Sequence, residues 1–156
     1  MTKKDSNFAE VLKERILVLD GAMGTMIQEY ELEESDFRGE IFTNHKSDLK
    51  GNNDILCLTK KQLITEIHEK YLESGCDIIE TNTFNANRIS QADYNAEQYC
   101  FELNKAAAKL AKEACENIQP NTNQDLLQGH WALQTKHSLS HQKSKIQDSE
   151  ILASMK

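Results

Sequence analysis

The chain has 156 residues, a formal net charge of −7 and 38% hydrophobic residues, a length that fits roughly one domain. The acidic balance excludes a basic surface for nucleic acid, and no apolar run approaches the roughly 20 residues that a membrane helix needs. The N-terminal stretch is polar and lacks the apolar core of a secretory signal, so we expect a cytoplasmic protein. The four cysteines show no CxxC spacing and are expected to be free thiols.

The composition changes at Pro120, the single proline of the chain. Residues 1–120 hold every Phe and Tyr and carry a net charge of −8. Residues 121–156 hold five glutamines and three of the five histidines, with a net charge of +1. This second composition buries too little apolar surface to offset the entropy of ordering the chain. We therefore predict a folded part over residues 1–120 and a disordered tail over residues 121–156.

The folded part begins with a predicted strand and a long loop. Residues 15–19 form an apolar run that ends in a Gly-rich turn, a pattern typical of a parallel strand buried on both faces. Residues 26–58 are acidic and irregular, and we predict a long loop there, of the kind that is usually functional or disordered.

A helix, a second strand and further helix are predicted next. Thr59 is the expected N-cap of the helix, because apolar residues follow it at helical spacing, and Gly75 is expected just after its end. Residues 77–84 (DIIETNTF) form the second predicted strand, and residues 86–118 a helical region of two helices. Strand, helix and strand in this order predict a β-α-β unit of an α/β fold.

Polar side chains follow both predicted strands. Asp20 ends the first strand, and Glu80, Thr81 and Asn82 end the second. Ligands of parallel α/β folds bind at the carboxyl ends of strands, where carboxylates can hold an ammonium group or accept a proton. A turn cap or a solvent-facing run explains either strand end taken alone. Two neighbouring strand ends together favour a binding site.

Several segments carry a resemblance to one family. They are ILVLDGAMGTMIQ (16–28), FRGE (37–40), LKGNNDIL (49–56), GCDIIETNTF (75–84) and QADY (91–94). Over residues 10–118 the chain resembles the N-terminal, homocysteine-binding domain of the cobalamin-dependent methionine synthases. The resemblance implies a TIM (β/α)8 barrel, of which this chain holds the first two β/α units, and methyl transfer to homocysteine to form methionine.

The resemblance also implies the ligands and the site. In the family, zinc held by three cysteine thiolates activates the homocysteine thiol, and cobalamin carries a methyl group taken from methyltetrahydrofolate. By the motifs they match, Asp20, Gly21, Glu80, Thr81 and Asn82 are expected to bind homocysteine, weakly at best in a fragment.

The cysteines of this chain do not match the family's zinc ligands, which lie further downstream. The cysteines present are Cys57, Cys76, Cys100 and Cys115. We therefore expect no metal ligand, no catalytic residue and no bound cofactor in this chain.

The tail resembles the family in a shifted reading frame. The family's third strand reads approximately RFVAGALGPTNKTLSLSP, whereas residues 125–142 read DLLQGHWALQTKHSLSHQ. Back-translation of residues 130–137 with suitable codons, read from the third base, gives LGPTNKT. We interpret residues 121–156 as a frame-shifted tail, and a splice variant, a gene-model error and a pseudogene are equally open as its origin. Two functions follow: an enzyme fragment that is inactive alone, or a non-enzymatic short isoform that acts as an interaction or regulatory fragment.

Overall fold

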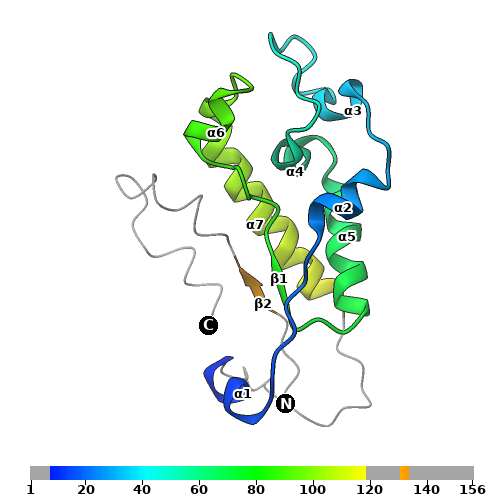
Figure 1. The fold of residues 1–156 in the computed structure, drawn as a ribbon, viewed down its shortest axis with the longest axis vertical. Coiled ribbons are helices and arrows are strands. Elements are labelled where there is room, and N and C mark those ends of the chain that lie inside the picture. Colours follow the sequence, from blue (N-terminus) through cyan, green and yellow to red (C-terminus); the bar gives the residue numbers. More distant parts are fainter. Residues whose placement is uncertain (1–7, 119–130, 134–156) are drawn as a thin grey trace.

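Helices dominate the part of the chain that the computed structural model describes, which is residues 8–118 and 131–133 (Figure 1). Short parallel β-structure runs through the middle of this part, and α1 lies at the opposite end from α3 and α6. The elements in chain order are α1 (Phe8–Glu14), α2 (Met23–Gln28), α3 (Glu34–Arg38), η1 (Asn53–Ile55), α4 (Leu56–Thr59), α5 (Lys61–Glu73), β1 (Ile78–Glu80), α6 (Arg88–Ala92), η2 (Glu97–Tyr99), α7 (Cys100–Asn117) and β2 (Trp131–Leu133).

The parallel β-structure is centred on β1. On one side, the N–H of Asp20 donates to the carbonyl oxygen of Ile78 at 2.9 Å, and Leu19 forms a parallel bridge with Ile78. On the other side, β1 pairs in parallel with β2, with Ile78 opposite Trp131. The second strand was thus predicted correctly in place, although β1 is shorter than the predicted range 77–84.

The first predicted strand differs from expectation. Residues 15–19 do not form a buried strand; the pairing is a single bridge at Leu19, and the side chains of Ile16, Val18 and Leu19 are 88%, 54% and 46% exposed. A strand that is apolar on both faces needs cover on both. The described part of the chain gives this segment one neighbouring strand and leaves these apolar side chains uncovered.

The described residues do not close a barrel. They form a helix-rich unit with a short parallel sheet, so the predicted parallel α/β arrangement is present while the barrel is not. Of the predicted disordered tail, residues 121–156, the structure describes β2 alone, which pairs with β1. The rest of that tail lies outside the described residues.

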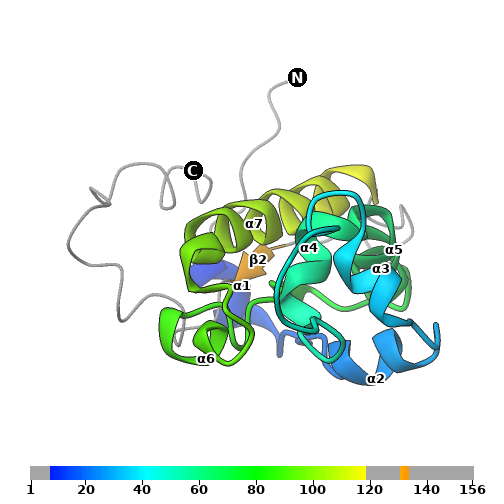
Figure 2. The same ribbon diagram turned by 90° about the horizontal axis from the view of Figure 1, so that it is seen from above.

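The two longest helices, α5 and α7, pack on each other, and α7 lies on one face of β1 and β2 (Figure 1, Figure 2). Apolar residues at helical spacing form the buried face of α5, as predicted. The helix starts one residue later than expected, with Lys60 and not Thr59 at its N-cap. Gly75 follows its end with φ of 96°, the left-handed conformation that glycine adopts at low cost.

The predicted long loop, residues 26–58, is instead ordered and contributes to the core. It contains α3, η1 and α4, and Phe37, Leu49 and Ile55 are buried within it. The carboxylate of Glu34 accepts hydrogen bonds from the N–H groups of Leu49 and Lys50 at 2.9 and 2.6 Å. Helices of three to five residues are too short to show a helical period in the sequence, which explains the incorrect prediction.

The predicted pair of helices over residues 86–118 is confirmed. Asn87 caps α6, because its side-chain oxygen accepts hydrogen bonds from the N–H groups of Ile89 and Ser90 at 3.1 and 3.0 Å. The α7 helix turns a row of small and apolar residues inward, among them Leu103, Ala107 and Leu110.

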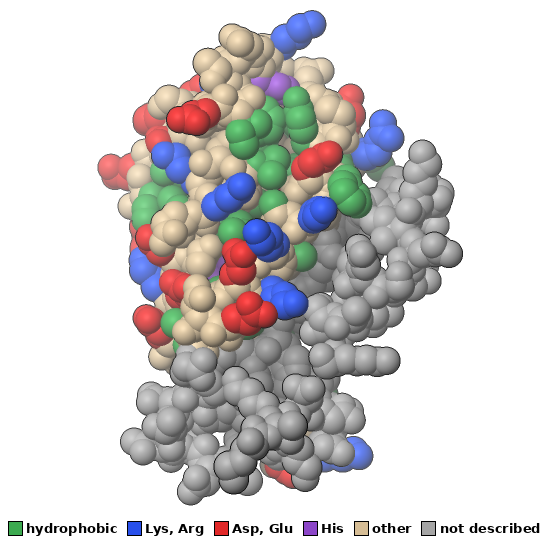
Figure 3. All heavy atoms as spheres, turned by 180° about the vertical axis from the view of Figure 1, so that it is seen from behind, with side chains coloured by type: hydrophobic (Ala, Val, Ile, Leu, Met, Phe, Trp, Pro, Cys, Tyr) green, Lys and Arg blue, Asp and Glu red, His purple; other side chains and the backbone are tan. Residues whose placement is uncertain are grey.

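Charged and apolar side chains alternate over the surface. Figure 3 shows acidic, basic and hydrophobic groups interspersed on the face turned away in Figure 1. Among the described residues, no helix is both long enough and apolar enough to cross a membrane.

Candidate ligand-binding site

A cavity of about 350 Å³ opens where residues 18–20 and β1 reach their carboxyl ends. Three segments form its wall: the turn after Asp20, residues 51–54 before α4, and the stretch that follows β1. Its lining consists of Asp20, Gly21, Ala22, Met23, Gly24, Gly51, Asn52, Asn53, Asp54, Glu80, Thr81, Asn82, Thr83, Phe84, Asn85 and Tyr94. All five residues that the sequence analysis selected are therefore in one cavity.

Asp20 and Glu80 lie side by side at the strand ends. The N–H of Glu80 donates to Asp20 Oδ1 at 3.0 Å. This hydrogen bond joins residues 15–20 to β1 in addition to their backbone pairing. Burial raises the pKa of Asp20 to about 6, the hydrogen bond from Glu80 lowers it, and the Glu80 charge raises it further. Asp20 is thus ionised above this pH and holds its charge in a partly dehydrated position.

A second carboxylate, Asp54, lies deeper in the same wall. It is 4% exposed, and its Oδ1 accepts a hydrogen bond from the N–H of Asn85 at 2.9 Å. Burial raises the pKa of Asp54 to about 6, and hydrogen bonds from backbone N–H groups oppose that rise. Asp54 therefore fastens the chain after β1 to the segment before α4.

Side-chain amides hold the segment before α4 in place. Asn52 and Gln91 exchange two hydrogen bonds, at 2.8 and 3.1 Å, and both residues are buried. Gln91 also donates to the carbonyl oxygen of Asn85 at 3.1 Å. Buried amides that satisfy each other in this way fix the relative position of α6 and this segment.

Asn82 links the strand end to the cavity floor. Its Nδ2 donates to the carbonyl oxygen of Asn53 at 2.7 Å, and its own carbonyl oxygen accepts a weak hydrogen bond from the thiol of Cys57 at 3.4 Å. The hydroxyl groups of Thr81 and Thr83 lie 2.8 Å apart and are buried. These residues are part of the cavity wall, and their role in binding stays a prediction.

The cavity is electronegative. Its lining contains the carboxyl groups of Asp20, Asp54 and Glu80, and no Lys, Arg or His is among the lining residues. Carboxylates that meet no cation in a cleft attract a positively charged ligand group, because the low-dielectric walls strengthen their field. The arrangement is suited to bind an ammonium group.

The sequence analysis did not identify part of this wall. Asn52, Asn53 and Asp54 were assigned to a loop, although they occur in the quoted motif LKGNNDIL. Phe84 and Tyr94 were likewise in quoted motifs but were not selected. The signal available in the sequence was the run of three polar residues, Asn52 to Asp54, directly after Gly51.

The described cysteines do not fit the zinc centre that the resemblance implies. Burial raises the pKa of Cys57 to about 12 and that of Cys76 to about 11, so both are buried, protonated thiols at neutral pH. Within residues 8–118 and 131–133, no three His, Cys, Asp or Glu side chains converge as metal ligands would.

Comparison with known proteins supports the fold and identifies the family. One similar solved structure is that of the homocysteine methyltransferase MmuM from Escherichia coli in its oxidized form, with 21% sequence identity and a TM-score of 0.54. The likeness covers 71% of this chain and 34% of that one, so the chain spans about a third of the length of the protein it matches.

The match to a family model covers more of the chain than the match to that structure. The family model described as homocysteine S-methyltransferase matches residues 17–148, a range that includes all lining residues of the cavity and continues into the predicted tail. Because this range is most of the 156 residues, the chain belongs to the homocysteine S-methyltransferase family.

Proposed function

We propose that this chain provides the amino-acid-binding end of a homocysteine S-methyltransferase and binds homocysteine through its ammonium group. The carrying observation is the pairing of Asp20 with Glu80 at adjacent strand ends, in a cavity with a third carboxylate and no basic lining residue. Asp20 and Glu80 would attract the ammonium group, and Asp54, which also lines the cavity, would add to the field.

The proposal includes the finer family assignment. The motifs LKGNNDIL and GCDIIETNTF favour the cobalamin-dependent methionine synthases within the wider family. There, zinc lowers the pKa of the homocysteine thiol so that a thiolate nucleophile exists at neutral pH. The described residues hold the amino-acid end of the substrate and offer no ligand set for that metal.

We further propose that this chain alone does not transfer the methyl group. The described residues form no closed barrel, and catalytic geometry needs side chains held to within about 0.5 Å. The assay is methionine formation from homocysteine and methylcobalamin with added zinc. Turnover above the protein-free blank that is lost in Asp20→Ala would show that the short chain builds a working site.

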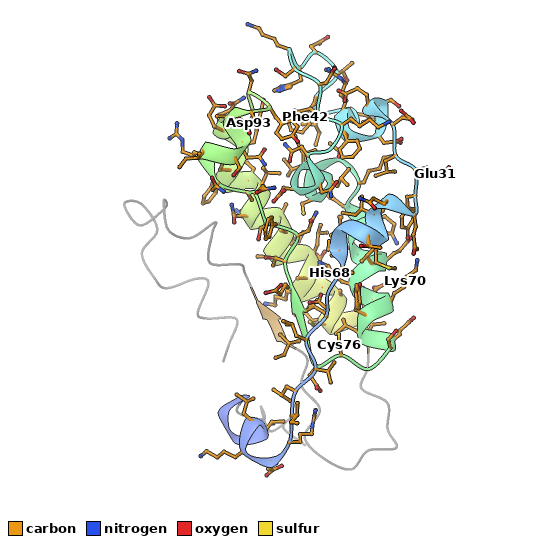
Figure 4. All side chains as sticks on the ribbon, in the orientation of Figure 1. Glu31, Phe42, His68, Lys70, Cys76 and Asp93 are labelled. Atoms are coloured by element: carbon orange, nitrogen blue, oxygen red, sulfur yellow. The ribbon has the colours of Figure 1, made fainter. Side chains whose placement is uncertain are left out.

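Binding is tested separately by calorimetry or NMR titration with homocysteine and with 4-mercaptobutyrate, which lacks the amino group. We expect homocysteine to bind more tightly, and Asp20→Ala to weaken it by about fivefold, the equivalent of ~1 kcal/mol for a partly exposed ion pair. Asp93→Ala is the matched control, because Asp93 is exposed at the C-cap of α6 and does not line the cavity (Figure 4). Equal affinity for both ligands would refute the ammonium site.

The exposed apolar side chains of Ile16, Val18 and Leu19 favour a second candidate, the non-enzymatic interaction fragment. In that case these side chains meet a partner protein. If the partner is a second copy of the chain, we expect self-association that increases with concentration in sedimentation experiments and is abolished by Val18→Lys. A monomer at every concentration would contradict association with a second copy of the chain.

A further inference from the structure

Asp20 and Gly21 form a dipeptide with its own chemistry. They are the single Asp-Gly pair in the 156 residues, and the sequence has no Asn-Gly pair. An aspartyl residue followed by glycine is prone to attack by the next backbone nitrogen on the side-chain carbonyl carbon, because glycine has no Cβ to obstruct the approach. Whether this occurs in a folded protein depends on the freedom of the backbone at that point.

The structure leaves the backbone at Gly21 unrestrained by packing. Gly21 is exposed, and a Cβ placed on it would meet no atom within 4 Å. The next residue, Ala22, has φ of 46°, a left-handed conformation that costs an L-residue free energy. The turn between Asp20 and α2 is thus open to solvent, and its backbone is strained at Ala22.

The carboxyl group of Asp20 is bonded through one of its two oxygens. Oδ1 accepts the hydrogen bond from Glu80 N–H, which orients the group, while Oδ2 has no hydrogen-bond partner among the described residues. Burial raises the pKa of Asp20 to about 6, the hydrogen bond from the Glu80 N–H lowers it and the Glu80 charge raises it, so part of this carboxyl is protonated near pH 6. The groups that interact electrostatically with it are Glu80, Tyr71, Cys76 and Cys115. The neutral carboxyl is the form that loses water in the reaction.

We propose that Asp20 is a site of spontaneous isoaspartate formation in the folded chain, through a cyclic succinimide with Gly21. The backbone nitrogen of Gly21 forms a bond to Cγ of Asp20, the bond from Cγ to the protonated Oδ2 breaks, and the amide proton leaves with that oxygen as water. A water molecule then opens the ring. Attack at Cγ restores Asp20, and attack at its main-chain carbonyl carbon gives isoaspartate, with no oxidant or reductant involved.

The modification would disable the cavity. In isoaspartate the main chain runs through Cβ and Cγ, so the backbone gains one carbon and the free carboxylate moves to the α-carbon. The hydrogen bond between Asp20 Oδ1 and Glu80 N–H then has no acceptor in place. Ageing of the protein would therefore remove one carboxylate from the candidate site by a route that leaves the composition and the mass of the chain unchanged.

The experiment is incubation of the full chain at pH 6 and 37 °C, followed by trypsin digestion. Cleavage after Arg15 and Arg38 releases the peptide of residues 16–38, which contains Asp20 and Asp36. We expect time-dependent isoaspartate at Asp20, detected by resistance to cleavage at that aspartate and by labelling with an isoaspartyl methyltransferase. Asp36, which precedes Phe37, is the internal control and should stay unmodified.

Gly21→Ala is the matched variant, because the added methyl group fits the empty space and the glycine has no positive φ. It should lower isoaspartate at residue 20 severalfold without changing the circular dichroism spectrum. Incubation of the wild-type chain in concentrated urea gives the rate of isoaspartate formation at Asp20 in the unfolded state. Isoaspartate that forms in urea but not in the folded chain would overturn the proposal, because the fold would then protect the bond. Equal formation in Gly21→Ala would also overturn it, since attack by the residue-21 nitrogen requires the unobstructed glycine.

Discussion

His68 makes the stability of this fold depend on pH. Its side chain is on the inner face of α5, fully buried, while Lys70 on the same helix is exposed (Figure 4). Neither ring nitrogen has a hydrogen-bond partner among the described residues. Burial lowers the pKa of His68 to about 4 from its usual 6.5, because the charged imidazolium would lose its hydration without gaining a partner.

The size and sign of the effect follow from linkage. Above pH 6.5 the ring is neutral in both states and costs no pH-dependent free energy. As the pH falls below 6.5, the unfolded chain takes up a proton that the folded chain refuses, so the free energy of unfolding decreases. With the two pKa values above, this loss reaches about 2–3 kcal/mol at pH 4.5, a large part of the ~5–15 kcal/mol that stabilises a typical domain.

The perturbation that isolates this effect is His68→Leu. Asp20 and Asp54 titrate in the same range with the opposite sign, because their raised pKa values make folding take up protons as the pH falls below about 6. Both aspartates are present in the two proteins, so their contributions cancel in the difference. We expect urea unfolding, followed by circular dichroism, to show the variant gaining about 2–3 kcal/mol over the wild type between pH 7.5 and 4.5.

The result that refutes this reasoning is a difference in unfolding free energy that stays constant across that pH range. It would mean that His68 finds a proton acceptor in the folded chain or reaches solvent. An independent measurement is the NMR titration of the His68 ring, which should remain neutral to below pH 5. Removal of two unpaired nitrogens should also make His68→Leu at least as stable as the wild type at pH 7.5.

Three further predictions concern the contacts that hold the site. Gln91→Leu should lower the unfolding free energy by about 2–3 kcal/mol in urea titrations, because it leaves the buried amide of Asn52 unpaired; an effect below about 0.5 kcal/mol would contradict the assigned pair. Asp77→Asn breaks a two-point ion pair with Arg15 and should cost about 1 kcal/mol, less in high salt; a loss independent of salt would contradict the ionic contribution. Gly39→Ala should lower the thermal midpoint, since φ is 50° and the new Cβ would lie 3.1 Å from an α4 side chain; an unchanged midpoint would show that the turn relaxes.

Local patterns predicted the parts of the fold that are long enough to repeat. The α5 helix, thirteen residues long, shows several turns of apolar periodicity, and Gly75 marks its end because few other residues tolerate the left-handed conformation there. The rim residues Asp20 and Glu80 were found by the rule that ligand-binding groups follow parallel strands. Each of these signals is contained in a single segment.

Features that depend on distant partners could not be predicted in this way. The segment before α4 forms the cavity wall because Asn52 pairs with Gln91 and Asp54 with Asn85, and nothing in the local sequence identifies those partners. The exposure of Ile16 and Val18 was missed because the partners that their pattern calls for are absent from the described residues. Their pattern predicts a strand covered on both faces, but the described chain does not supply that cover.

The contacts that form the cavity and those that would close the sheet are physically separate. Asp20 with Glu80, Asn53 with Asn82 and Asp54 with Asn85 are all joined within the described residues. At the outer edge the backbone of Val18 is hydrogen-bonded to Asp77 and Ile78, but the side chains of Ile16 and Val18 are exposed. The wall of the candidate site is therefore held by hydrogen bonds within the described residues, whereas the apolar surface at Ile16 and Val18 is left uncovered by them. Covering that surface should raise the unfolding free energy while leaving the affinity for an ammonium group almost unchanged.

A variant such as Val18→Lys, which removes part of the apolar surface without touching the cavity, should accordingly improve solubility and keep the difference in binding between homocysteine and 4-mercaptobutyrate. Loss of that difference would show that the two sets of contacts are coupled through the short pairing at Leu19.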